Sequence, residues 1–218
     1  MTSKTDTPRS IPWLRKLVIP GLAGAVAGFA ASYVLFSTID GPLVGGLGTS
    51  QTIAAVVGML YGLIALAVLF GALSPKMGAR FLNVEDADEL REQRRALILS
   101  GVAMALWGVA LIALALAAPD GPVPQQVALV IGIVGLAGGV VVAIRLNPLL
   151  DELMRAVNLE TGALSYHLVL LLVGGWALLA HLGYVAGPQP IDLLSAFYVL
   201  VLLASFVVVG KRGMIRLQ

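Results

Sequence analysis

The sequence predicts an all-α, polytopic integral membrane protein with six transmembrane helices arranged as three antiparallel hairpins. Three observations lead to this fold class: an apolar composition, six long apolar runs and a one-sided distribution of charge. Of the 218 residues, 59% are hydrophobic and 12% are charged, whereas a soluble domain carries about 25% charged residues. Because backbone groups in lipid must be paired within the protein, the apolar runs predict helices.

Six apolar runs are each long enough to cross the hydrocarbon layer, which is ~30 Å thick and requires about 20 helical residues. The connections after the first, third and fifth runs are short, so each of these runs is expected to form a hairpin with the next. The predicted spans are residues 17–36, 53–73, 96–118, 127–144, 163–185 and 193–210.

The basic residues lie on alternate connections of the chain. All 14 lysines and arginines precede the first span, follow the sixth, or lie between the second and third or the fourth and fifth. The other three connections contain none. Because cytoplasmic loops carry the excess of lysine and arginine, both termini are predicted to be cytoplasmic.

The chain ahead of the first span is polar. Residues 1–12 contain two prolines and few apolar side chains, which predicts a disordered cytoplasmic N-terminus followed by a six-helix domain over residues 13–218. The apolar run 17–36 is too long for the core of a cleavable signal peptide. With no cysteine in the chain, these features predict a multi-pass protein of a bacterial inner membrane.

Two charged connections on the predicted cytoplasmic side are expected to be helical. Residues 83–97 begin with Asn83, a good N-cap, and run from acidic to basic, as the helix dipole favours. They predict a solvated extension of the third span, open to a soluble partner or to anionic lipid. The residues of both connections predicted to meet a cytoplasmic partner are Asp88, Glu89, Arg91, Arg94, Arg95, Asp151, Glu152 and Arg155.

The second of these connections predicts a short interfacial helix between the fourth and fifth spans, over residues 147–158. Asn147 can cap it, and Pro148 fits the first helical position. Its leucines share one arc of the helical wheel, opposite Asp151 and Glu152, as in a helix lying on the inner leaflet. Residues 159–162 are predicted to form a hinge before the fifth span.

Small residues recur at every fourth position in three spans. Helices in lipid associate through close packing, which small side chains permit. We expect these stripes to pack the bundle itself; the alternative is that one of them holds a second copy or a partner subunit. The stripe residues singled out for helix packing are Gly24, Gly28 and Ser32 in the first span, Gly58 and Gly62 in the second, and Gly135 and Gly139 in the fourth.

The two histidines, His167 and His181, both lie in the fifth predicted span. On an unbroken α-helix they would be ~21 Å apart and within ~40° of one face. This spacing resembles the arrangement in b-type cytochromes, in which one helix supplies an axial ligand to each of two haems. The sites would need a second pair of histidines from a symmetric dimer or a partner. The alternative is that both rings reach water near the two edges of the membrane.

Other chemistry finds little support in the sequence. No aspartate, glutamate, lysine or arginine lies in the middle of any predicted span, which argues against ion-coupled transport. Phosphate-binding, metalloprotease and nucleophile-elbow motifs are missing. The seven carboxylates near the cytoplasmic side alternate with arginines, which favours salt-bridged helices over a metal site. We therefore predict no catalytic residue and no metal site, and we expect no cofactor unless His167 and His181 hold haem.

Three function classes follow from these observations. The first is a non-enzymatic accessory, assembly or scaffold subunit, whose partners are the lipid bilayer and a second copy or another membrane protein, but no nucleic acid. The alternative is a small transporter or channel for a neutral or lipophilic solute. The second alternative is a b-haem redox protein formed as a dimer. The residues that could line a solute route are Tyr61, Ser100, Trp107 and Trp176.

Overall fold

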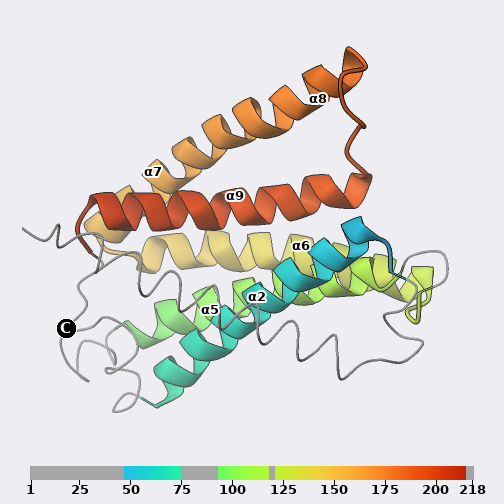
Figure 1. Ribbon diagram of the computed structural model, residues 1–218. Coiled ribbons are helices and arrows are strands. Elements are labelled where there is room, and N and C mark those ends of the chain that lie inside the picture. Colours follow the sequence, from blue (N-terminus) through green and yellow to red (C-terminus); the bar gives the residue numbers. More distant parts are fainter. Residues whose placement is uncertain (1–46, 75–92, 118–120, 215–218) are drawn as a thin grey trace, which may run out of the picture. The chain divides into compact units, whose positions relative to one another are not determined.

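The computed structural model describes residues 47–74, 93–117 and 121–214 (Figure 1). Within these ranges the chain forms helices and no strand. Two short irregular helices interrupt the α-helices: a 3₁₀ turn, η1, at Asn147–Leu149 and a π-helix, η2, at Val169–Val173. The α-helices are α2 (Thr49–Leu73), α5 (Arg94–Ala115), α6 (Gln125–Leu146), α7 (Glu152–Leu168), α8 (Gly174–His181) and α9 (Pro190–Lys211).

Five helices in the described residues are long and apolar enough to cross a membrane, which indicates a membrane-embedded protein. They overlap the second to sixth predicted spans. The predicted first span, residues 17–36, and the predicted N-terminal segment, residues 1–12, lie outside the described residues, as does most of the predicted helix 83–97. The five helices are Thr49–Leu73, Arg94–Ala115, Gln125–Leu149, Glu152–His181 and Pro190–Lys211.

The prediction of a separate interfacial helix with a hinge at residues 159–162 is wrong. One helix begins at Glu152 and continues without a break through η2 and α8 to His181. Its N-cap is Asp151 and not Asn147, because the Asp151 carboxylate accepts a hydrogen bond of 2.6 Å from the Met154 amide. This bond satisfies one of the free N–H groups of the first turn.

The absence of a hinge also has a physical cause. Glycine inside a helix costs only about 1 kcal/mol relative to alanine, so Gly162 alone does not end α7. Glu160, whose charge interrupts the local apolar pattern, is paired with Arg212 at the end of α9. The positive charge of Arg212 compensates the negative charge of Glu160, although the two residues are far apart in the chain. The helix therefore continues where the sequence pattern suggested a stop.

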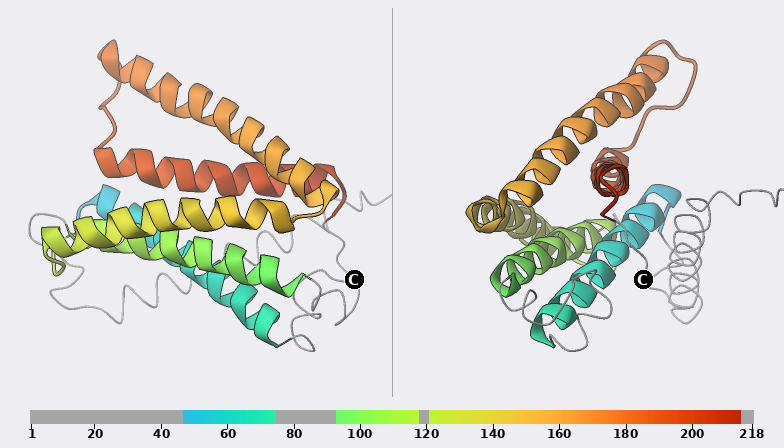
Figure 2. Two further views of the ribbon diagram at one scale, coloured as in Figure 1. Left: turned by 180° about the vertical axis from the view of Figure 1, so that it is seen from behind. Right: turned by 90° about the vertical axis from the view of Figure 1, so that its left-hand side faces the viewer.

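The helices pack in an order that differs from their order in the chain. α5 lies between α2 and α6, α9 packs against α2 and touches α5, and α7 packs against α9. The views in Figures 1 and 2 show this arrangement, with α7 and α8 diverging from α9 toward the far end of α8. The side of α7 that packs is a stripe at four-residue spacing, Val157, Thr161 and Ser165, all buried.

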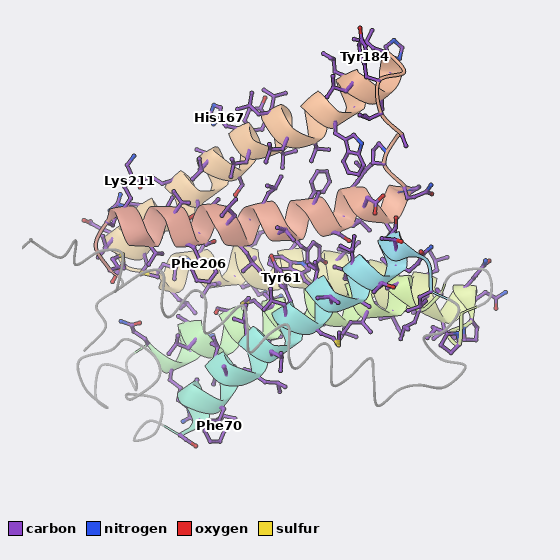
Figure 3. The ribbon with its side chains drawn as sticks, viewed as in Figure 1. Tyr61, Phe70, His167, Tyr184, Phe206 and Lys211 are labelled. Atoms are coloured by element: carbon purple, nitrogen blue, oxygen red, sulfur yellow. The ribbon has the colours of Figure 1, made fainter. Side chains whose placement is uncertain are left out.

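Positive charge in the described residues is confined to one end of the bundle. The helix ends that carry it lie together in Figure 1, and Figure 3 shows Lys211 at this end and Tyr184 at the opposite end. The acidic Asp192 lies in the first turn of α9, away from the basic end. The basic residues are Arg94 and Arg95 at the start of α5, Arg145 in the last turn of α6, Arg155 near the start of α7, and Lys211 and Arg212 at the end of α9.

The helices α2 and α5 approach each other closely at two glycines, Gly58 and Gly108. A Cβ atom added to Gly108 would lie 2.8 Å from the carbonyl oxygen of Gly58 and 3.0 Å from the amide nitrogen of Gly62. A Cβ atom added to Gly58 would lie 2.9 Å from the carbonyl oxygen of Gly108. These neighbours are backbone atoms, so neither helix could make room without moving as a whole.

We expect Gly108→Ala to destabilise the protein, because the new methyl group forces α2 and α5 apart. Overpacking of this kind costs roughly 1–3 kcal/mol. The measurement is the free energy of unfolding in mixed detergent micelles. The matched control is Gly62→Ala on α2, where an added Cβ meets nothing within 4 Å. Equal stability of Gly108→Ala and Gly62→Ala would contradict the close contact.

Candidate functional site

Three aromatic side chains form a chain of hydrogen bonds in the middle of the bundle. The Tyr61 hydroxyl on α2 donates to the backbone oxygen of Tyr198 on α9 at 2.8 Å. The Tyr198 hydroxyl donates to the backbone oxygen of Trp107 on α5 at 3.1 Å. The two phenol rings also touch, with centroids 4.8 Å apart and planes tilted by 56°. We call Tyr61, Trp107 and Tyr198 the aromatic network; Figure 3 shows Tyr61 between α2 and α9.

The indole of Trp107 extends this network to a fourth helix. Its Nε1–H points to the backbone oxygen of Leu136 on α6, with 3.4 Å between nitrogen and oxygen. The ring lies on Gly139, where an added Cβ atom would overlap the indole nitrogen. Glycine at this position is therefore what lets the indole lie flat against α6. The network joins α2, α5, α6 and α9 near their midpoints.

The chemistry of the network is that of a structural clamp. A hydroxyl or indole N–H in an apolar layer costs free energy unless it is hydrogen-bonded. Each of the three side chains has one donor hydrogen, and all three donors are used within the bundle. Tyr61 and Trp107, which could have lined a solute route, therefore have their donors occupied by neighbouring helices.

Trp176, another residue considered for that route, lies elsewhere. It is on α8, and its Nε1–H donates to the backbone oxygen of Ala186 at 2.9 Å, in the connection to α9.

Sequence reasoning missed Tyr198, the third member of the network. The available signal was that Tyr198 is the only tyrosine in the last predicted span, and a phenol hydroxyl at that depth needs a partner.

The small-residue stripes of α2 and α6 make contacts within this chain. Gly58 meets Gly108, and Gly139 lies under Trp107. A Cβ atom on Gly135 would lie 2.7 Å from both the Leu106 oxygen and the Ala110 Cβ atom of α5. Gly62 has open space at its own Cβ position. The first-span residues Gly24, Gly28 and Ser32 lie outside the described residues.

Both histidines are exposed on the long helix that ends with α8. His167 is on the side of α7 turned away from α9 (Figure 3), its Nδ1 lies 2.7 Å from the Ala163 backbone oxygen, and its ring meets Tyr166 edge-on. The π-helix between His167 and His181 adds about one residue to the turn. This rotates their relative direction from about 40° to about 140°. The two histidines were expected to share one face of the helix as haem ligands, and that expectation assumed an unbroken α-helix. With the π-helix between them, they do not share a face.

The predicted cytoplasmic residues are brought to the basic end of the bundle, where Arg94, Arg95, Glu152 and Arg155 are exposed. Asp151 caps α7, as described above. Asp88, Glu89 and Arg91 lie outside the described residues.

A charge pair not singled out from the sequence joins α7 to the end of α9. Arg212 holds Glu160 in a two-pronged salt bridge, with Nε–Oε2 at 3.0 Å and Nη2–Oε1 at 2.5 Å. The hydrogen bonds that Arg212 donates to the Glu160 carboxylate raise the pKa of Arg212 above its already high ordinary value. The partners are 52 residues apart in the chain, so no local pattern relates them.

Within the described ranges, no group of three or more histidine, aspartate or glutamate side chains is placed to hold a metal ion. The fold and the aromatic network define the class of the protein: a helical, membrane-embedded bundle whose central polar side chains join its helices. No protein-family model, no curated protein and no solved structure matches the chain.

We expect Tyr61→Phe to lower the free energy of unfolding by roughly 0.5–1.5 kcal/mol, the usual value of one hydrogen bond. The variant keeps the ring packing on Tyr198 and removes only the bond between α2 and α9. Unfolding in mixed micelles measures the change. Tyr184→Phe is the control, because Tyr184 is 75% exposed at the end of the bundle. If both variants unfold like the parent protein, the network does not hold the helices.

Proposed function

We propose that this protein is a non-enzymatic accessory, assembly or scaffold subunit that binds another integral membrane protein through the helix Glu152–His181. The observation that carries the proposal is the poor cover of this helix. It is the longest of the five membrane-length helices in the described residues, at 30 residues. Yet only 6% of its most apolar stretch of 18 residues is buried inside the protein. The corresponding share in the other four is 22–33%.

Exposed apolar side chains are ordinary in lipid, so exposure alone does not define a binding surface. Helices in a bilayer associate where backbones can approach closely. Gly174 and Gly175 at the start of α8 supply such a place, because an added Cβ atom would find only Leu170, at 4.0 Å, or nothing. The leucines just before them, 170–172, are more than half exposed. A partner helix could pack there without displacing any contact of the bundle.

We further propose that the basic end of the bundle is cytoplasmic and that both termini lie on that side of a bacterial inner membrane. The support is the gathering of all six basic residues of the described ranges at one end, as the positive-inside rule describes. The exposed Arg94, Arg95, Glu152 and Arg155 then face the cytoplasm, where they can contact soluble parts of the same partner.

A second candidate function is a route for a lipophilic solute. It is supported by one observation, the divergence of α8 from α9 (Figures 1 and 2), which gives the bundle a side that faces lipid directly. A route along this side is better supported than a route through the centre of the bundle, because the hydrogen-bond donors of the aromatic network are already occupied there.

The binding proposal predicts site-specific cross-links from the long helix in living cells. A photoreactive side chain at Leu171, which is 70% exposed, should give one discrete adduct with a different membrane protein. The same group at Leu66 on α2, which is 65% exposed, should give only lipid adducts. Gly175→Leu should remove the Leu171 adduct by blocking close approach. An adduct between two copies would indicate a homodimer instead, and lipid adducts at both positions would refute the proposal.

The orientation proposal predicts one-sided labelling of introduced cysteines. Because the chain has no cysteine, a membrane-impermeant maleimide reports only the introduced position. In sealed right-side-out vesicles Tyr184→Cys should react, whereas Glu152→Cys should react only after the membrane is permeabilised. The opposite pattern would place the basic end outside, and labelling of both positions in sealed vesicles would exclude a single fixed orientation.

A further inference from the structure

The first half of the long helix is fixed to α9. α7 buries Val157, Thr161 and Ser165 along the side that packs, and the Ser165 hydroxyl is satisfied by the Thr161 backbone oxygen at 2.7 Å. At the basic end, Arg212 donates two hydrogen bonds to the Glu160 carboxylate. Packing and a salt bridge therefore both hold α7 in place.

The second half of the helix departs from α9 just after this fixed part. The π-helix η2, Val169–Val173, begins one residue after α7 ends, and no residue of η2 or α8 is buried. All three views show α8 leaving α9 beyond this point (Figures 1 and 2). A π-helical turn interrupts the regular hydrogen-bond ladder and is a recognised cause of helix bending.

Two consecutive glycines follow the π-helix, and packing does not explain them. At Gly58, Gly108 and Gly139 a Cβ atom would collide with a neighbouring helix, but at Gly174 and Gly175 it would not. What two adjacent glycines do supply inside a helix is backbone freedom. The π-helix and the glycine pair together make a weak point of seven residues, 169–175.

The connection from α8 to α9 belongs to α8. The Trp176 indole holds the Ala186 backbone oxygen, and a Cβ atom on Gly187 would lie 3.9 Å from the Ala180 Cβ atom. α9 starts separately, with a capping box between Gln189 and Asp192. The two units meet at Pro188, so a second pivot lies in the backbone bonds next to it, between the folded-back connection and the capped start of α9.

From these contacts we infer that residues 176–186, which we call the α8 arm, move as one unit relative to α9. The pivots are residues 169–175 and Pro188. Swinging inward closes the arm on the exposed apolar side chains of α9, and swinging outward opens the side of the bundle to lipid. The motion changes few contacts of the bundle, because α8 has no buried residue to withdraw. This inference does not depend on the proposed partner.

The test is a pair of distance measurements between spin labels in the full-length protein in lipid nanodiscs. The chain has no cysteine, so labels attach only at Leu178→Cys on α8 and Val199→Cys on α9. Leu159→Cys on α7 and Val207→Cys on α9 form the control pair; all four positions are at least 43% exposed. The α8–α9 pair should give a broad or two-peaked distance distribution, and the control pair a narrow one. An α8–α9 distribution as narrow as the control overturns the inference.

The size of the effect follows from the geometry. α8 has 8 residues and is about 12 Å long, and a bend of ~20° at its base shifts its far end by about 4 Å. The label at Leu178 lies about 6 Å from the base and therefore moves by about 2 Å. This smaller shift sets the extra width expected for the α8–α9 distribution.

A double variant, Gly174→Ala with Gly175→Ala, tests the position of the pivot. No clash is expected, since both sites are open, and alanine stiffens the helix. The α8–α9 distribution should become narrow and the control pair should stay unchanged. The thermal stability should not fall, because alanine favours the helix. Gly162→Ala, an equally open site within fixed α7, should leave both distributions as they were. A broad α8–α9 distribution that survives the double variant means that the arm does not pivot there and overturns the inference as stated.

Discussion

The contact of two glycines, Gly58 on α2 and Gly108 on α5, is the constraint on which the rest of the bundle depends. It brings two backbones so close that a Cβ atom on either glycine would lie within 3 Å of a backbone oxygen of the other helix. Trp107 adjoins Gly108 and Tyr61 lies one turn from Gly58, so the same crossing puts both aromatic residues at one level. Tyr198 can then bond to both helices at once. With a wider crossing Tyr61 and Tyr198 could not both keep their partners, and a donor without a partner in an apolar layer costs a few kcal/mol.

The bundle therefore has two regions that differ in how they are held. Around the aromatic network, four helices are joined by close packing and by hydrogen bonds that reach from one helix to another. In the region of α7 and α8, the Ser165 hydroxyl bonds to its own helix, at Thr161. Here α7 is held to α9 by its buried stripe and by the salt bridge of Glu160 and Arg212, and α8 has no buried residue. Motion, and the binding of a partner, are expected where contacts between the helices are few.

Local signals gave the membrane-length helices correctly but not their neighbours. Hydropathy and run length depend on consecutive residues, and they located the five spans that the structure describes. The N-cap at Asp151 was missed because Asn147 and Pro148 form an equally good start in sequence; only the backbone shows which carboxylate or amide reaches an N–H group. The pair Glu160–Arg212 and the bonds of Tyr198 join residues far apart in the chain, so no periodicity reveals them. The π-helix has no sequence signal of its own, and the angle between His167 and His181 could not be predicted without it.

The glycine pair of α8 links the proposed partner to the proposed motion. A partner helix that packs against Gly174 and Gly175 would contact the pivot of the α8 arm directly, so its affinity must differ between the open and closed positions. A ligand with unequal affinity for two conformations shifts the equilibrium between them by that difference. The relation is reciprocal: anything that fixes the arm must change the affinity for the partner by the same factor. If both proposals hold, the coupling would lie at residues 169–175, where both glycines have open space, because α7 is packed on α9 and the rest of the long helix would move with the arm.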